Sequence, residues 1–182
     1  MDKISYILHR SGRKTLAIKI TREGVLVYAP NRARREDIDR FVESKRSWIE
    51  GKLEAQDKRP VLPVLSEAEL DILRRQARTS LSQKAAFFAN QLGVSYCRIS
   101  IRSQRTRWGS CSGKGNLNFN CLLMLTPERV QDYVVVHELC HLLEMNHSPA
   151  FWRLVESILP DYRQQKTWLK KNGVALVERL PE

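Results

Sequence analysis

The stretch VVVHELCHLLEMNH, residues 134–147, holds three of the chain's four histidines within eleven residues. On an α-helix, residues four apart lie on the same face, so His137 and His141 can present two imidazole nitrogens to one ion. Valines before His137 and leucines after Glu138 predict that this helix is buried in a hydrophobic core. The HExxH spacing therefore predicts a zinc site on a core helix.

The residues after the first histidine suit catalysis as well as binding. A catalytic zinc site uses three protein ligands and leaves a fourth position for water. Glu138 lies about 100° around the helix from His137, which places its carboxylate beside that water as a proton acceptor. His147 follows His141 after five residues, enough for the chain to bend back, and Asn146 tolerates the left-handed conformation that suits a bend. These residues predict a zinc hydrolase.

Two neighbouring side chains compete for ligand roles. Glu144 returns to the face of His137 but lies about 4.5 Å beyond His141 along the helix axis, so it is either a ligand, a partner of a ligand or an exposed carboxylate. Cys140 is rotated away from both histidines, which favours a buried core position. A zinc site without catalysis also fits the three histidines, although Glu138 then has no role.

The segments on either side of the stretch predict further helices. Pro127 suits the first turn of the helix that carries the histidines. Ser148-Pro149 predicts the start of a second helix, which ends at Pro160. Asp161 predicts the start of a third, which Asn172-Gly173 ends.

A long helix and two strands precede the stretch. Ser66 and Glu69 form a capping-box pattern, and the helix that they begin is expected to run to about Gln91, before Gly93. Beyond it, apolar and polar residues alternate in two short segments separated by a glycine-rich turn. The strands are predicted at 96–101 and 115–120, and the turn at 108–113.

The first third of the chain predicts a smaller unit. Residues 15–20 and 25–29 read as a hairpin around a turn at 21–24. Apolar residues at helical spacing predict a single amphipathic helix over 34–54. Two prolines without periodicity indicate a linker. The predicted class is α+β. An N-terminal hairpin-and-helix subdomain is expected at 1–57, a linker at 58–65 and a main domain at 66–182.

The composition is that of a globular protein with an uneven positive charge. The net charge is +11; residues 1–60 hold 15 Lys/Arg against 9 Asp/Glu, residues 61–115 hold 9 against 3, and residues 116–182 hold 7 against 8. The excess outside the histidine-rich part favours contact with nucleic acid, nucleoprotein or acidic protein surfaces. A solvated basic surface is the alternative.

Cysteine usage and hydropathy indicate where the chain resides. No apolar run approaches the roughly 18 residues of a membrane span, and the N-terminus lacks the pattern of a secretory signal. No membrane partner is therefore expected. The four cysteines form no CxxC pair, which predicts free thiols and a cytoplasmic location.

Several segments together resemble the YgjP-like metallopeptidase family of predicted zinc-dependent hydrolases, which is related to SprT-like and WLM proteases. The segments are RWGSCS (107–112), LNFNCLLMLTP (117–127), DYVVVHELCHLLEMNHSPAFW (132–152) and Tyr162 to Trp168. The resemblance implies that residues 66–182 form a minimal zincin fold, in which a short sheet packs against the helix that carries the metal ligands. It also implies one Zn²⁺ per chain, held by His137, His141 and His147, with Glu138 as base and a peptide as substrate.

Companion residues gain roles by the same comparison. Asn118 and Asn120 face one side of a strand, where they are able to bind a substrate backbone or serve as ordinary polar positions. Tyr133, one turn before His137, is either an oxyanion donor or a packing residue. The remaining three candidates form a basic strip before Trp108 that suits polyanions or solvent, namely Arg102, Arg105 and Arg107.

The sequence thus supports one leading hypothesis and two alternatives. The leading hypothesis is a zinc metallopeptidase that uses a metal-activated water and Glu138 as general base. The first alternative is a nucleic-acid-associated basic protein, contacting its partner through residues 1–115, with a structural or regulatory zinc. The second is a hydrolase of non-peptide amides.

Overall fold

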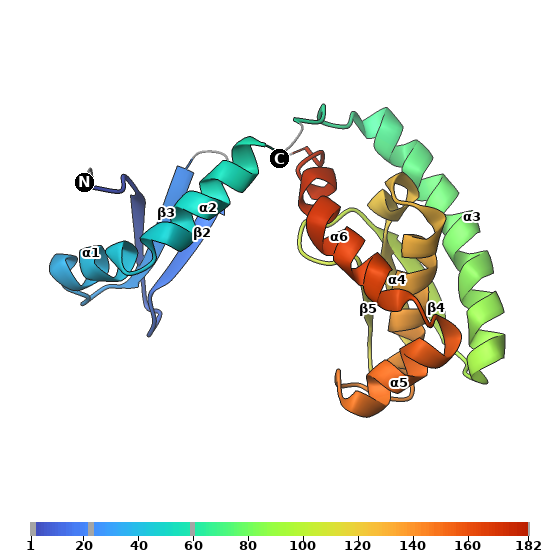
Figure 1. Ribbon diagram of the computed structural model, residues 1–182. Helices are drawn as coiled ribbons and strands as arrows, with labels where there is room; N and C mark the ends of the chain where they lie inside the picture. The colour runs from blue at the N-terminus through green and yellow to red at the C-terminus, as the bar shows by residue number, and fades with distance from the viewer. Residues whose placement is uncertain (1–2, 22–23, 59–60, 182) are drawn as a thin grey trace. The chain divides into compact units, whose positions relative to one another are not determined.

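The computed structural model describes residues 3–21, 24–58 and 61–181, and it confirms the α+β class. The chain divides into two compact units, Met1–Pro60 and Val61–Glu182 (Figure 1). Each unit has a three-stranded sheet and a hydrophobic core of its own. Part of the turn expected at 21–24 and part of the linker expected at 58–65 lie outside the described residues, namely 22–23 and 59–60.

The sheet of the first unit is built on β3, Gly24–Pro30. β2, Ala17–Thr21, pairs with it in antiparallel direction, as the predicted hairpin requires. β1, Ile7–Ser11, pairs with the other edge of β3 in parallel direction. The sequence pattern does not predict β1, because its few apolar residues stand among polar ones and its partner is distant along the chain.

Two helices cover one face of this sheet, where the sequence predicts one. α1 spans Arg35–Glu43 and α2 spans Arg46–Asp57. The break lies at Ser44 and Lys45, whose amides bond back to Arg40 and Val42 and close α1. The prediction of a continuous helix was wrong because apolar spacing continues across the break. Buried residues of both helices and of β3 form the core of this unit: Val25, Val27, Ala29, Ile38, Val42 and Ile49.

The second unit begins with α3, Glu67–Leu92, and confirms the predicted long helix. The side chain of Ser66 accepts from the amide of Glu69, and the carboxylate of Glu69 accepts from the amide of Ser66 at 2.8 Å. Gly93 ends the helix in the left-handed conformation (φ 66°). α3 buries one face and exposes the other, and no helix among the described residues is long and apolar enough to cross a membrane.

The sheet of the second unit has the order β4-β6-β5. β4, Arg98–Arg102, and β6, Asn116–Asn120, pair in parallel where the two strands were predicted. Gly109–Cys111, predicted as part of a turn, forms a third strand, β5, which pairs antiparallel with β6. Three residues are too few to show the alternation that identifies a strand.

After β6, the 3-10 helix η1, Cys121–Leu125, leads to α4, Glu128–Cys140. α5, Pro149–Ile158, starts at Ser148, whose side chain accepts from the amide of Phe151 at 3.2 Å, as predicted. α6, Tyr162–Val177, was predicted to end at Asn172-Gly173 but continues beyond them.

Gly173 therefore has a different role from ending the helix. A Cβ atom at this buried position would lie 3.0 Å from the Cζ2 atom of Trp108. The indole ring occupies the space that a side chain would need, and the glycine is what allows loop and helix to approach closely.

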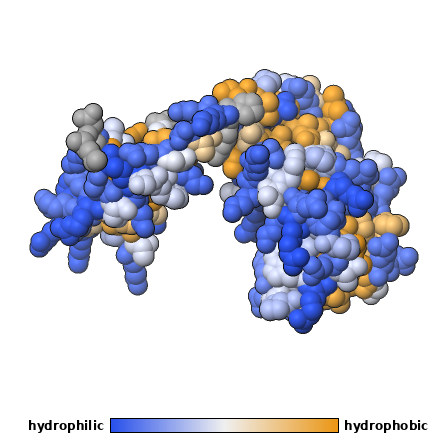
Figure 2. All heavy atoms as spheres, viewed as in Figure 1, coloured by the Kyte–Doolittle hydropathy of each residue, from blue (hydrophilic) through white to orange (hydrophobic). Residues whose placement is uncertain are grey.

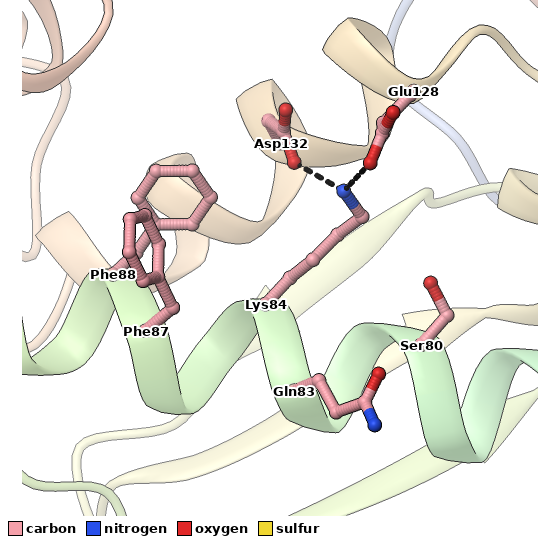
Figure 3. Close-up of a pocket in the computed structure, with 7 residues that line it drawn as sticks. All are labelled: Ser80, Gln83, Lys84, Phe87, Phe88, Glu128 and Asp132. Atoms are coloured by element: carbon pink, nitrogen blue, oxygen red, sulfur yellow. Dashed lines mark hydrogen bonds and ion pairs between the residues drawn. The ribbon is translucent and has the colours of Figure 1, made fainter.

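A polar contact joins α3 to α4 beside the core. The Nζ of Lys84 on α3 donates to Asp132 at 2.7 Å and to Glu128 at 2.8 Å on α4 (Figure 3). The side chains of Lys84 and Asp132 are each 15% exposed. Burial lowers the pKa of Lys84, but its hydrogen bonds to the two carboxylates outweigh burial and raise the pKa overall. The contact fixes the position of α4 against α3.

We expect Lys84→Met to lower the free energy of unfolding by about 1–3 kcal/mol, because it leaves a partly buried carboxylate without its donor. Urea unfolding followed by circular dichroism measures the change. The matched variant Lys114→Met, at an exposed turn position, should shift stability by less than about 0.5 kcal/mol. Equal stability of the two variants would show that the contact contributes nothing.

Candidate metal centre and active site

Helix α4 and the start of α5 bring three histidines together. His137 lies in the last turn of α4, His141 is the residue that ends this helix, and His147 immediately precedes the N-cap of α5. Nitrogen atoms of the three imidazoles, one from each ring, lie within 4.8 Å of one another. The three are therefore able to hold one metal ion.

The bend between His141 and His147 is made by backbone hydrogen bonds. The amides of Leu143 and Glu144 donate to the carbonyl of Cys140 at 3.1 and 2.9 Å, and the amide of Ser148 donates to that of Asn146 at 2.8 Å. No residue other than glycine has a positive φ in the part of the chain that the structure describes. Asn146 therefore does not use the left-handed conformation that it tolerates, because tightening of the helix end makes the turn instead.

The bend also orients His141. Its Nδ1 lies 3.0 Å from the carbonyl oxygen of Glu144. A carbonyl oxygen only accepts, so Nδ1 carries the proton and Nε2 keeps a free lone pair. Glu144 therefore contacts a histidine through its backbone, and its carboxylate is not part of the three-histidine group.

The nitrogens of His137 and His147 suit a shared ion. Their Nε2 atoms lie 3.0 Å apart, close to the roughly 3.3 Å between two nitrogens bound at 2.0–2.1 Å to one tetrahedral zinc. Burial, then the neighbouring His141, His147 and Lys166, lower the pKa of His137 to about 3. Neutral imidazoles have the lone pairs that a cation needs, and this donor set fits a divalent metal.

Glu138 lies beside the histidines and is 6% exposed. Burial raises the pKa of its carboxyl group to about 8, and the positive charge of Arg107 opposes this shift. The carboxylate also contacts β5 closely: a Cβ atom at Gly109 would lie 2.6 Å from both the Cγ and the Oε1 atoms of Glu138. Only glycine at this position leaves room for the carboxylate.

Aromatic rings surround the histidines. Phe151, fully buried, lies 4.6–4.9 Å from all three imidazole rings, measured between centroids. Trp152 stacks on His147 at 5.6 Å and on Tyr162 at 5.3 Å. Tyr133 contacts His137 edge to face at 5.8 Å, and burial raises the pKa of its hydroxyl to about 12. These rings hold the imidazoles in place, while His147 stays exposed to solvent.

The two predicted asparagines have different environments. Asn118 donates to the hydroxyl of Ser110 across β5 and β6 at 3.1 Å. Asn120 is fully buried, donates to the carbonyls of Gln104 and Arg107, and accepts from the amide of Leu122. Asn120 holds the loop before β5, and its buried side chain agrees with the alternative of a polar position that makes no contact with substrate.

The three arginines of the predicted basic strip have different partners. Arg105 donates to the carbonyls of Leu180 and Pro181 at 2.7 and 2.8 Å, so its guanidinium fastens the C-terminal segment. Arg102 is exposed at the end of β4. Of the three arginines, Arg107 alone acts on the charge of Glu138.

Two residues near the site are not predicted by the sequence. Gly109 limits the position of Glu138, and Cys111, on the same strand, has a raised pKa because of burial and the nearby Glu138 charge. Both lie within RWGSCS, a segment that the family resemblance singles out. The sequence does not show that this segment contacts the HExxH helix, because the contact forms only when the chain folds.

The comparison with protein families agrees with this geometry. The family described as YgjP-like, metallopeptidase domain matches residues 14–70 and 64–172, most of the chain. The chain belongs to this family. As a YgjP-like protein it is a metal-dependent peptidase, which implies a divalent metal and peptides or proteins as substrates.

Two solved structures are similar to half of this YgjP-like chain. The metallopeptidase zymogen of Pyrococcus abyssi abylysin is 23% identical with a TM-score of 0.46, and the match covers 50% of this chain and 93% of that one. The metallopeptidase zymogen of Methanocaldococcus jannaschii jannalysin is 19% identical with a TM-score of 0.44, covering 50% and 92%. No curated protein matches the chain.

We expect Gly109→Ala to displace the Glu138 carboxylate and to reduce peptidase activity by at least about tenfold, since misplacement of a reacting group by about 1 Å is costly. Metal content should stay unchanged, because no histidine moves. Gly113→Ala is the matched control: nothing lies within 4 Å of its added Cβ atom. Full activity in Gly109→Ala would contradict the proposed tight contact.

Proposed function

We propose that this protein is a zinc-dependent peptidase in which His137, His141 and His147 bind one Zn²⁺ per chain and Glu138 is the general base. The observation that carries the proposal is the approach of three histidine nitrogens to within 4.8 Å, with a buried carboxylate on the adjacent residue. Three imidazoles with no thiolate or carboxylate in the group favour zinc with an open position for water.

The chain's own residues divide the work of hydrolysis. When bound, the metal lowers the pKa of water and polarises the substrate carbonyl. The Glu138 carboxylate takes a proton from the attacking water and returns it to the departing amine. Burial raises the pKa of Glu138 to about 8, and the charge of a bound cation acts in the opposite direction. The carboxyl group is thereby suited to both halves of the proton transfer.

The substrate is proposed to lie along β5. This strand is the edge of its sheet, since the order is β4-β6-β5, and its Gly109 contacts Glu138. An extended peptide can add to such an edge through main-chain hydrogen bonds. Asn118, which bonds to Ser110 on this strand, would support the edge and contact the substrate.

Tyr133 is the proposed donor to the developing oxyanion. Its ring contacts His137, and its hydroxyl makes no hydrogen bond within the described residues. A pKa of about 12, raised chiefly by burial, keeps this hydroxyl protonated at neutral pH. A protonated hydroxyl without a partner can donate to an oxygen that becomes negative.

We expect Glu138→Gln to reduce the rate of peptide hydrolysis by at least about a hundredfold, because the amide accepts no proton from the water. One zinc per chain should remain bound, because glutamine keeps the size of the side chain. Mass spectrometry of digested protein mixtures measures cleavage, and atomic emission measures zinc. Glu144→Gln is the matched control, since Glu144 contacts His141 through its backbone only. Wild-type cleavage by Glu138→Gln would exclude this residue as the base.

We expect His147→Ala to lose zinc and activity together, because two histidines alone leave the ion weakly held. His9→Ala, at the one histidine outside the cluster, should keep one zinc per chain. Treatment of the wild type with a chelator should abolish activity, and added zinc should restore it. Unchanged zinc content in His147→Ala would assign the third ligand to another residue.

A further inference from the structure

The sheet of the first unit has one face without a helix. Its core side chains, among them Leu8, Ile18, Val25 and Val27, all point toward α1 and α2. Side chains alternate along a strand, so the intervening residues form the opposite face. Within the described part of the first unit, no helix packs on this open face.

The register of the strands gives the composition of the open face. One row across the sheet contains Ile7, Leu26 and Lys19, and the next contains His9, Tyr28 and Ala17. Ile7 is 48% exposed, and His9 and Lys19 are exposed as well. The paired residues of this sheet include no acidic side chain. Aromatic, apolar and cationic groups therefore share a flat surface.

The aromatic groups form a stack with a cation. The rings of His9 and Tyr28 are 5.3 Å apart and inclined by 22°. The guanidinium carbon of Arg13 lies 5.7 Å from the centroid of the Tyr28 ring. The Nε of Arg13 is buried and has no hydrogen-bond partner in the described residues. The N–H group at this atom is therefore a donor that makes no hydrogen bond within the described residues.

Charge is segregated between the two layers of this unit. Residues 1–34, which include the strands, hold eight Lys/Arg and two Asp/Glu, and the two acidic residues are Asp2 and Glu23. Residues 35–60, which include the helices, hold seven of each. In the helix layer the carboxylates pair with cations, as in Arg46 with Glu43 and Lys58 with Glu54. The excess of six positive charges belongs to the part of the chain that forms the sheet.

We propose that the open face of the first unit binds single-stranded nucleic acid, with bases stacking on the exposed His9 ring of the His9–Tyr28 pair and phosphates contacting Arg13 and Lys19. Every base offers a π-face, so an aromatic platform beside cations holds a single strand without reading its sequence. An acidic protein would use the cations but would have no need of stacked rings. In Figure 2, hydrophilic residues cover most of the visible face of the first unit.

This binding surface shares no residue with the proposed zinc site, because its residues come from the strands of the first unit and from the segment between β1 and β2, and it requires no metal. Binding should therefore persist in Glu138→Gln and in chelated protein. Loss of the proposed peptidase function would leave this inference untouched, and the reverse also holds.

The test uses the full-length chain and a fluorescein-labelled single-stranded DNA of about 12 nucleotides, with RNA of the same length beside it. Fluorescence anisotropy should show binding that weakens as salt rises from about 50 to 200 mM. His9→Ala should weaken affinity at least about fivefold, as expected for loss of one stacking ring, without changing the salt slope. Lys19→Gln should reduce the log–log salt slope by about 0.7, the effect of one phosphate contact.

Matched controls separate this surface from net charge. Lys52→Gln removes the same charge from α2 and should leave both affinity and slope as in the wild type. Double-stranded DNA should bind more weakly than the single strand, because its bases are already stacked. An absence of binding, equal effects of Lys52→Gln and Lys19→Gln, or competition by polyglutamate as strong as by the unlabelled oligonucleotide would overturn the proposal, and the last would indicate an acidic protein partner.

Discussion

Burial of α4 on nearly all sides is the constraint on which the candidate site depends. Nine of its 13 residues are buried, and α3, α5, α6 and the sheet of the second unit all contact it. A helix packed in this way cannot rotate or slide without opening cavities and exposing valines and leucines. The directions of His137 and Glu138 are therefore set by the core, and only His147 has to be brought in by a bend.

The same burial sets the chemistry available to these side chains. Burial keeps His137 neutral and raises the pKa of Glu138 to about 8. Burying such polar groups without partners costs free energy of folding. Phe151, Trp152 and Tyr133 cause this burial, because their rings pack around His137. A bound cation would give the buried imidazole of His137 a partner for its lone pair. The second unit thus combines a hydrophobic core with a polar site prepared for a metal.

Local signals in the sequence predicted much of this arrangement, and contacts between distant segments account for what they missed. Ser66 with Glu69 and Ser148 marked helix starts correctly, because capping depends on neighbouring residues only. β1 and β5 were missed because their pairing partners decide that they are strands. Gly173 looked like a helix end, but its role depends on Trp108, and the role of Gly109 depends on Glu138. The histidine stretch was readable because the i, i+4 spacing and the adjacent carboxylate are local.

Catalysis as proposed requires that three histidines of one helix-and-bend segment hold a single zinc beside Glu138. X-ray absorption at the zinc edge of the full-length protein tests it most directly, because the spectrum reports both the kind and the number of ligands. The spectrum should show one zinc per chain with three imidazole nitrogens at about 2.0–2.1 Å and one further light atom. A spectrum with sulfur ligands, or with fewer than three imidazoles, would contradict it.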